Sequence, residues 1–253
     1  MFAMRTATST DPFVCSECGH TSEAIYYDVV DAVEDPAAKE KVLSGEAFTH
    51  TCPSCGAIYT LDYPMLYIDG DCRCMVYCAG GCEVGENVDT IFDSFADLED
   101  AEQESPSALL TNRAGVRRRI VPTPEALMEK LDIFYAGLDD RIVELLKVST
   151  MSALEVEHNT PVEWMMFDRV EPETGELVYV ARSDSFEEGL SDIDVNRSYY
   201  DEIASDGELI DALNTVPYDF YVDVPWAIEV FSADMSEEIA EAAEGQDADQ
   251  SKA

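Results

Sequence analysis

A short cysteine motif that occurs twice constrains this chain more than any other feature. The two copies read Val14-Cys15-Ser16-Glu17-Cys18-Gly19 and Thr51-Cys52-Pro53-Ser54-Cys55-Gly56. The two-residue spacer lets both sulfurs of one copy reach a single metal ion, and the glycine permits the turn that follows. Two copies supply the four thiolates of a closed tetrahedral zinc site. The sequence therefore predicts one structural zinc ion with Cys15, Cys18, Cys52 and Cys55 as its ligands.

Dithiol redox chemistry is the alternative for either CxxC pair alone. Repetition of the motif with the same glycine favours one shared metal site over two independent redox pairs. His20 and His50 lie beside the motifs and could replace a thiolate. With four thiols present, we expect both histidines to lie outside the coordination sphere.

Four further cysteines follow the second motif, at Cys72, Cys74, Cys78 and Cys82. The first three share one parity, so a single unbroken strand would direct them to the same face. One flat strand cannot wrap a tetrahedral ion, whereas cysteine packs readily as a small apolar side chain. We therefore expect these thiols to be packed in the core and the chain to bind one zinc, with a second metal site as the alternative.

The charge of the chain is strongly negative, because 54 Asp and Glu residues oppose 15 Lys and Arg residues and give a formal net charge of −39. The electrostatic field of so negative a chain repels phosphate backbones and anionic lipid. We therefore expect a protein partner rather than nucleic acid or a membrane surface. No apolar run reaches the roughly 18 residues of a membrane span, and residues 1–11 lack the apolar core of a secretory signal. We expect a cytoplasmic protein whose acidity reflects its environment, since the carboxylates are spread along the chain.

Composition and periodicity indicate an α+β protein in five segments. We predict a disordered arm at 1–12, a zinc-ribbon-like β module at 13–85, an acidic linker at 86–112, a mixed α/β C-terminal part at 113–231 and an acidic disordered tail at 232–253. In the β module, strands are expected at 24–30, 48–51, 57–61 and 75–77, and a helix at 35–43. In the C-terminal part we expect a strand at 116–121, an amphipathic helix pair at 124–147 that is split near Gly137, a hairpin at 162–181, a helix at 199–214 broken at Gly207, and an extended segment at 218–224.

Several stretches outside the cysteine motifs also carry a family resemblance. They are Tyr63-Pro64-Met65-Leu66-Tyr67-Ile68-Asp69, the helix from Leu127 to Phe134, Gly137-Leu138-Asp139-Asp140-Arg141, and Tyr221 to Ala227. With the two motifs, they resemble the bacterial CpXC-domain family from about Phe13 to Val230. The resemblance implies a zinc-binding module with Cys15, Cys18, Cys52 and Cys55 as its motif cysteines, although Ser16 stands where the pattern has proline. It implies no catalytic residue.

These observations favour a structural-zinc protein that acts by protein binding or scaffolding rather than as an enzyme. A four-thiolate site has no open position for water, which argues against metal-assisted hydrolysis. Asp139 and Asp140 point about 100° apart on a helix, so we expect a helix cap rather than an acid/base pair. The basic cluster of Arg113, Arg117, Arg118 and Arg119 is expected to neutralise the chain's own carboxylates, with an anionic ligand as the alternative. Two other functions remain open: a zinc-ribbon accessory factor of the transcription or translation machinery, and a thiol redox enzyme or sensor.

Overall fold

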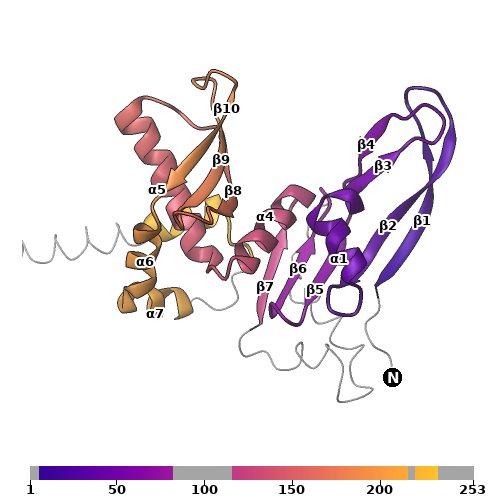
Figure 1. The fold of residues 1–253 in the computed structure, drawn as a ribbon. Coiled ribbons are helices and arrows are strands. Elements are labelled where there is room, and N and C mark those ends of the chain that lie inside the picture. The colour runs from indigo at the N-terminus through magenta and orange to yellow at the C-terminus, as the bar shows by residue number, and fades with distance from the viewer. Residues whose placement is uncertain (1–5, 82–115, 216–219, 233–253) are drawn as a thin grey trace, which may run out of the picture. The chain divides into compact units, whose positions relative to one another are not determined.

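The computed structural model describes residues 6–81, 116–215 and 220–232, which fall into two compact units (Figure 1). The first unit runs to Tyr135 and includes Phe220, and the second begins at Ala136 and includes the residues from Tyr221 onward. Each unit combines helices with strands, which confirms the mixed α+β class. Residues 117–135 belong to the first unit, whereas composition placed them in the C-terminal part.

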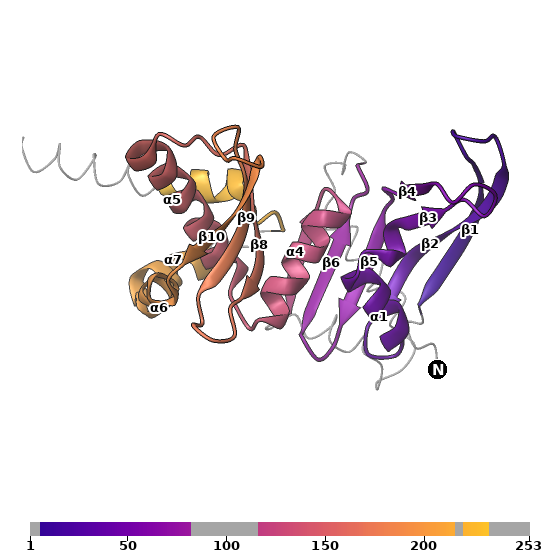
Figure 2. The ribbon, with the colours of Figure 1, turned by 45° about the horizontal axis from the view of Figure 1, so that its top comes forward.

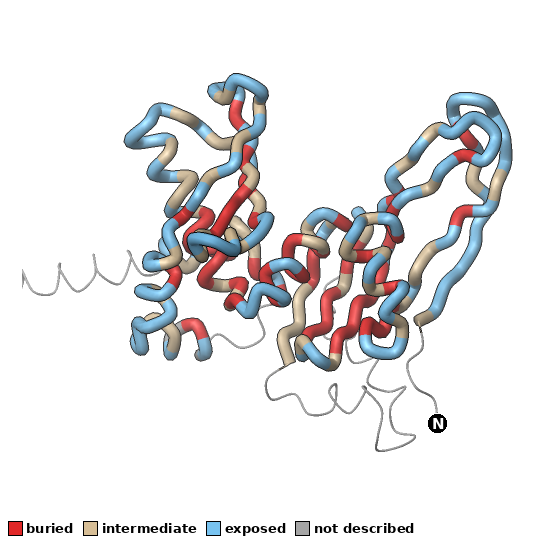
Figure 3. The backbone as a smooth tube through the Cα atoms, viewed as in Figure 1, coloured by how far each residue is buried: buried red, intermediate tan, exposed pale blue. Residues whose placement is uncertain are grey.

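A five-stranded mixed sheet forms the centre of the first unit. Its strands are β1 (Ala7–Val14), β2 (Thr21–Asp31), β5 (Met65–Asp69), β6 (Cys74–Cys78) and β7 (Arg117–Val121), in the order β1-β2-β5-β6-β7. Pairing is antiparallel in β1–β2 and β5–β6, and parallel in β2–β5 and β6–β7. All residues of β5 are buried, as Figure 3 shows, because both faces of this central strand are covered. Burial on both faces explains its nearly continuous apolar sequence.

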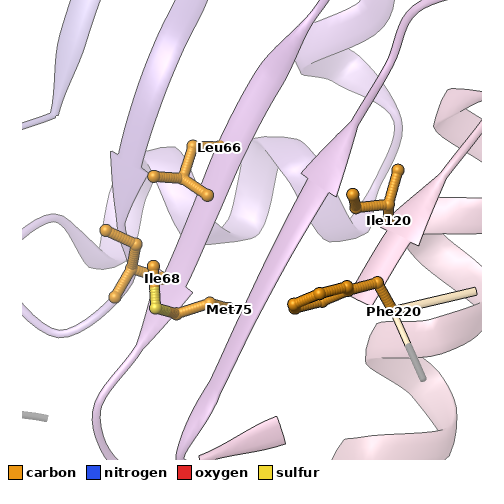
Figure 4. Close-up of a cluster of buried hydrophobic side chains, with 5 residues drawn as sticks. All are labelled: Leu66, Ile68, Met75, Ile120 and Phe220. Atoms are coloured by element: carbon orange, nitrogen blue, oxygen red, sulfur yellow. The ribbon is translucent and has the colours of Figure 1, made fainter. Parts of the chain in front are cut away.

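The two faces of this sheet differ in what covers them. Helices α1 (Pro36–Leu43) and α4 (Pro124–Tyr135) lie over one face, as Figures 1 and 2 show. The other face carries a cluster of Leu66, Ile68, Met75, Ile120 and Phe220 (Figure 4). The helix predicted at 35–43 is confirmed: the Asp35 side chain accepts a hydrogen bond from the Ala38 amide, and Pro36 opens the helix.

A second, smaller hairpin extends from the first unit beside β2. It consists of β3 (Thr49–Thr51) and β4 (Ile58–Thr60), and the 3-10 turn η1 (Glu46–Phe48) precedes it. Tyr63 anchors its base, because its hydroxyl donates to the Ala47 carbonyl at 2.8 Å. The Tyr63 ring also meets the Tyr26 ring edge-on and lies against Phe48, at centroid distances of 5.1 and 5.3 Å. These contacts fix the smaller hairpin relative to β2.

The second unit is built around the long helix α5 (Asp140–His158) and a three-stranded antiparallel sheet. The sheet has the order β10-β9-β8, with β8 at Trp164–Val170, β9 at Leu177–Arg182 and β10 at Leu190–Val195. Helices α6 (Arg197–Ser205) and α7 (Gly207–Thr215) follow, and residues 224–232 are helical. Part of the core consists of Leu145, Leu213, Val222, Trp226 and Ala227. The predicted hairpin, the Asp139 cap and the helix break near Gly207 are confirmed.

Two expectations are corrected, and one strand was not anticipated. Residues from Ala7 onward form β1 rather than a disordered arm, because they pair with β2 and so satisfy their backbone groups. The segment expected to be extended up to 224 instead enters a helix there, where the Asp223 side chain accepts from the Trp226 amide. Strand β10 was not predicted, because its alternating side chains are mostly acidic or half-exposed.

The predicted linker at 86–112, nearly all of the predicted tail, Arg113 and Cys82 lie outside the described residues. No helix in the described parts of the chain is both long enough and apolar enough to cross a bilayer.

Gly80 provides a test of this packing. Its φ is +58°, and a Cβ added there would lie 2.1 Å from the backbone carbonyl carbon of Tyr63. We expect Gly80→Ala to lower the free energy of unfolding by at least about 3 kcal/mol, measured by urea denaturation. Gly45→Ala is the matched control, because its φ is +76° but its added Cβ meets only the end of the flexible Met128 side chain, at 3.6 Å or more. The control should lose only about 1–2 kcal/mol, the cost of the left-handed conformation. Equal losses in the two variants would contradict a close backbone approach at Gly80.

Candidate metal centre

Each cysteine motif forms the turn of a hairpin. The β1–β2 pairing ends at Val14 and Thr21, so residues 15–20 form the first cysteine turn. The β3–β4 pairing ends at Thr51 and Ile58, so residues 52–57 form the second cysteine turn. Each motif is therefore held by strands that pair directly on either side of it.

The two cysteine turns have the same hydrogen bonds. The amide of the first cysteine donates to the carbonyl five residues later, from Cys15 to His20 at 2.9 Å and from Cys52 to Ala57 at 2.8 Å. The glycine amide donates back to that cysteine's carbonyl, at 2.9 Å in both turns. Gly19 and Gly56 have φ values of +70° and +77°, which explains why both motifs end in glycine. The repeated sequence therefore folds into a repeated structure.

The two turns bring their four thiols together. All four sulfur atoms lie within 4.8 Å of one another. Cys15 Sγ is 3.6 Å from Cys55 Sγ, and Cys18 Sγ is 3.7 Å from Cys52 Sγ. A tetrahedral ion with bonds of about 2.3 Å to sulfur requires sulfur–sulfur separations of about 3.8 Å. The four cysteines can therefore hold a metal ion with little rearrangement.

No second cluster of this kind is formed by the residues that the structure describes. Within those ranges, this is the only group of three or more His, Cys, Asp or Glu side chains whose ligand atoms converge. Cys72, Cys74 and Cys78 do not form one, and neither His20 nor His50 belongs to the group. His50 is engaged elsewhere, because its Nε2 lies 2.9 Å from Ser22 Oγ.

Tyr59, on β4, connects the two turns next to the cluster. Its hydroxyl accepts a hydrogen bond from the Glu17 amide at 3.3 Å and lies 3.1 Å from both Cys15 Sγ and Ser16 Oγ. The hydrogen bond from Tyr59 lowers the pKa of Cys15 to about 6, although burial opposes this effect. Tyr59 thus favours the thiolate form of one candidate ligand, as outer hydrogen-bond donors do in metal sites.

Cys55 shows the opposite shift. The backbone amide of Ala57 lowers the pKa of Cys55, but hydrogen bonds with Cys15 and Cys18, together with burial, raise it to about 12. Four crowded thiols therefore share protons, because several adjacent thiolates repel one another. A divalent cation at their centre removes this repulsion and allows all four to ionise.

Aromatic packing supports the cluster from one side. The Phe13 ring lies 4.7 Å from the His50 ring and 4.9 Å from the Tyr59 ring, so one β1 residue contacts both strands of the smaller hairpin. Sequence reasoning missed Phe13 and Tyr59. Phe13 precedes Cys15 by two residues and Tyr59 follows Cys55 by four, and nothing in this spacing indicates that they meet.

Comparison with known proteins gives one match. The family model described as CpXC protein matches residues 13–147, which is 135 of the 253 residues and spans both cysteine turns. No curated protein and no solved structure matches the chain significantly. The matched region begins at the end of β1 and contains the other four strands of the central sheet, the smaller hairpin, α4 and the first part of α5. The chain belongs to the CpXC family.

Proposed function

We propose that this protein is a zinc-ribbon-like binding module, in which one structural zinc ion joins two hairpins. The convergence of Cys15, Cys18, Cys52 and Cys55 carries the proposal, since each thiol of one hairpin has a partner on the other at 3.6 or 3.7 Å. A dithiol redox motif needs only the two cysteines of one turn. An ion shared by both turns instead requires sulfur atoms of one turn to lie next to sulfur atoms of the other, as they do here.

The donor set indicates the metal and its role. Four thiolates at tetrahedral separations suit zinc, and iron is the other metal that such sites commonly hold. Four protein ligands leave no open position, so the ion serves structure rather than hydrolysis. Strands β3 and β4 have three residues each, and a hairpin this short is marginal by itself. Metal binding would then stabilise the β3–β4 hairpin, because its few strand residues cannot stabilise it alone.

Exposed apolar residues beside the cysteine turns support a protein as the partner. Val14, directly before the first turn, is 63% exposed, and Ile58, directly after the second, is 72% exposed. The net charge of −39 opposes docking to nucleic acid. Apolar side chains at the tips of a metal-joined pair of hairpins form a small, fixed surface that suits a protein with a matching apolar patch.

The metal assignment is tested by elemental analysis of the reduced full-length protein. We expect one zinc per chain and little iron in the natural sequence, and near-complete loss of zinc in Cys15→Ser and Cys55→Ser. Both variants should melt at a lower temperature, because metal binding is coupled to folding. Cys78→Ala is the matched control, because it removes a buried thiol that lies outside the cluster. Zinc retained in Cys15→Ser and Cys55→Ser, or one iron in place of zinc, would refute the proposed site.

The partner assignment is tested with a surface variant that leaves the metal in place. Val14→Asp combined with Ile58→Asp should keep one zinc and the same melting temperature. We expect it to lose at least about tenfold in affinity for a partner captured by the natural sequence, because buried apolar contacts dominate such interfaces. Ile228→Asp is the control, since Ile228 is 50% exposed and lies in the second unit. Partners that bind all three proteins equally would show that the hairpin tips are not the binding surface.

A further inference from the structure

A second group of cysteines lies on the helix-covered face of the central sheet. Strand register pairs Asp69 with Cys74 and Cys74 with Arg117, so these three residues form one row across β5, β6 and β7. The sequence suggested that one strand carries both Cys72 and Cys74. In the structure, β6 begins at Cys74, and Cys72 lies in the turn between β5 and β6. Arg73, between the two cysteines, has a φ of +53°. This left-handed residue takes the chain out of the extended path on which the strand prediction depended.

Three contacts hold Cys72 in place. Its amide donates to Asp69 Oδ1 at 2.9 Å, and its carbonyl accepts from the Arg117 guanidinium at 3.1 Å. The same guanidinium nitrogen, Nη2, lies 3.4 Å from Cys72 Sγ. Arg117 is itself positioned by the Phe134 ring, whose centroid is 3.9 Å from the guanidinium carbon. A permanent positive charge is therefore fixed against one thiol.

Asp69 anchors this arrangement as a carboxylate. It is 1% exposed, yet Oδ2 accepts from Lys39 Nζ at 3.0 Å and from the Tyr135 hydroxyl at 2.5 Å. Burial alone would raise the pKa of Asp69, but the hydrogen bonds from Tyr135, the Cys72 amide and Lys39 outweigh it and lower that pKa. The turn that carries Cys72 is thus tied to a buried, ionised group.

The two thiols differ in protonation and in access. A hydrogen bond from Cys74 lowers the pKa of Cys72 to about 7; burial and Asp69 oppose this shift, while the charges of Arg117 and Lys39 assist it. The same hydrogen bond, together with burial, raises the pKa of Cys74 well above its usual value. Cys72 is half-buried, whereas Cys74 is 1% exposed. A partly exposed thiol with a lowered pKa is therefore hydrogen-bonded to a buried thiol that keeps its proton.

We propose that Cys72 and Cys74 form a hydroperoxide-reactive dithiol, with Cys72 as the nucleophile, Cys74 as the resolving thiol and Arg117 as a positioning residue. The Cys72 thiolate attacks one peroxide oxygen, so an S–O bond forms and the O–O bond breaks. The departing alkoxide or hydroxide takes a proton, and Cys72 is oxidised by two electrons to sulfenic acid. The Cys74 sulfur then attacks Cys72 Sγ; the S–S bond forms, the S–O bond breaks, and the hydroxide leaves as water with the Cys74 proton. A low-molecular-weight dithiol reduces the disulfide and is itself oxidised.

Charge and ring size favour this chemistry over others. A net charge of −39 repels anionic disulfides, whereas a small hydroperoxide is uncharged and is not excluded. A thiol whose pKa lies near ambient pH also combines a large thiolate fraction with high nucleophilicity. A disulfide between residues 72 and 74 closes a small ring, which makes it readily reducible. These properties fit a reversible redox pair better than a permanent crosslink. The proposal does not depend on the metal centre.

The first test measures alkylation of Cys72 by iodoacetamide in the folded, metal-loaded protein between about pH 5.5 and about pH 9. Mass spectrometry of peptides should give a midpoint near pH 7 for Cys72, with Cys74 and Cys78 protected. Arg117→Met should raise the midpoint by about one pH unit, and Arg117→Lys should restore most of the shift. Arg119→Met is the control, because it removes the same charge two residues along the strand and should leave the midpoint unchanged. A midpoint at or above about 8.5 in the natural sequence would overturn the proposal.

The second test treats the natural sequence with one equivalent of hydrogen peroxide while a chromophoric chelator reports any released metal. Trypsin cleaves after Arg73 and separates the two cysteines, so a Cys72–Cys74 disulfide leaves peptides 42–73 and 74–113 joined. Fragmentation of the joined species should assign the bond, and dimedone should trap the sulfenic acid of Cys72 in Cys74→Ala. Oxidation at the cysteine turns with metal release, while Cys72 stays reduced, would refute the redox role and leave the metal assignment standing.

Discussion

Mutual repulsion among four thiolates is the constraint on which the first unit depends. The cysteine turns bring their sulfur atoms to 3.6 and 3.7 Å across the gap between two hairpins, where ionised sulfur requires a cation. Phe13, Tyr59 and Tyr63 hold the hairpins in this arrangement, but they do not remove the electrostatic cost. A single ion held by the four cysteines would remove this cost and would join segments that are distant in sequence. The exposed Val14 and Ile58 lie on strands whose ends such an ion would fix.

Three environments give the described cysteines three different properties. In the cysteine turns, crowding and the Tyr59 hydroxyl prepare the thiols for a metal. At the β5–β6 turn, the hydrogen bond from Cys74 and the charge of Arg117 lower the pKa of Cys72, while Cys74 keeps its proton. On β6, burial raises the pKa of Cys78 to about 11, as expected for a packed, unreactive thiol. Neighbouring charge and solvent access thus determine what each cysteine can do.

The sequence predicted the features that depend on local rules. The paired motifs indicated their four converging thiols, and the caps at Asp35 and Asp139 located two helices correctly. The expectation that these cysteines pack in the core holds for Cys78 but is incomplete for Cys72 and Cys74. Alternation of side chains along one strand cannot relate these two residues, because Arg73 between them turns the chain. The pairing of Cys74 with Arg117 depends on strand register between residues more than forty positions apart, which no local pattern encodes. Tyr59 was missed for the same reason.

X-ray absorption spectroscopy at the zinc edge tests the central claim most directly, because it reports the identity and distance of the atoms bound to the ion. The natural sequence, purified with its metal under reducing conditions, should show four sulfur neighbours at about 2.3 Å and no nitrogen or oxygen neighbour. A first shell that contains imidazole nitrogen or water oxygen, or fewer than four sulfur atoms, would contradict a closed site formed by the two cysteine turns.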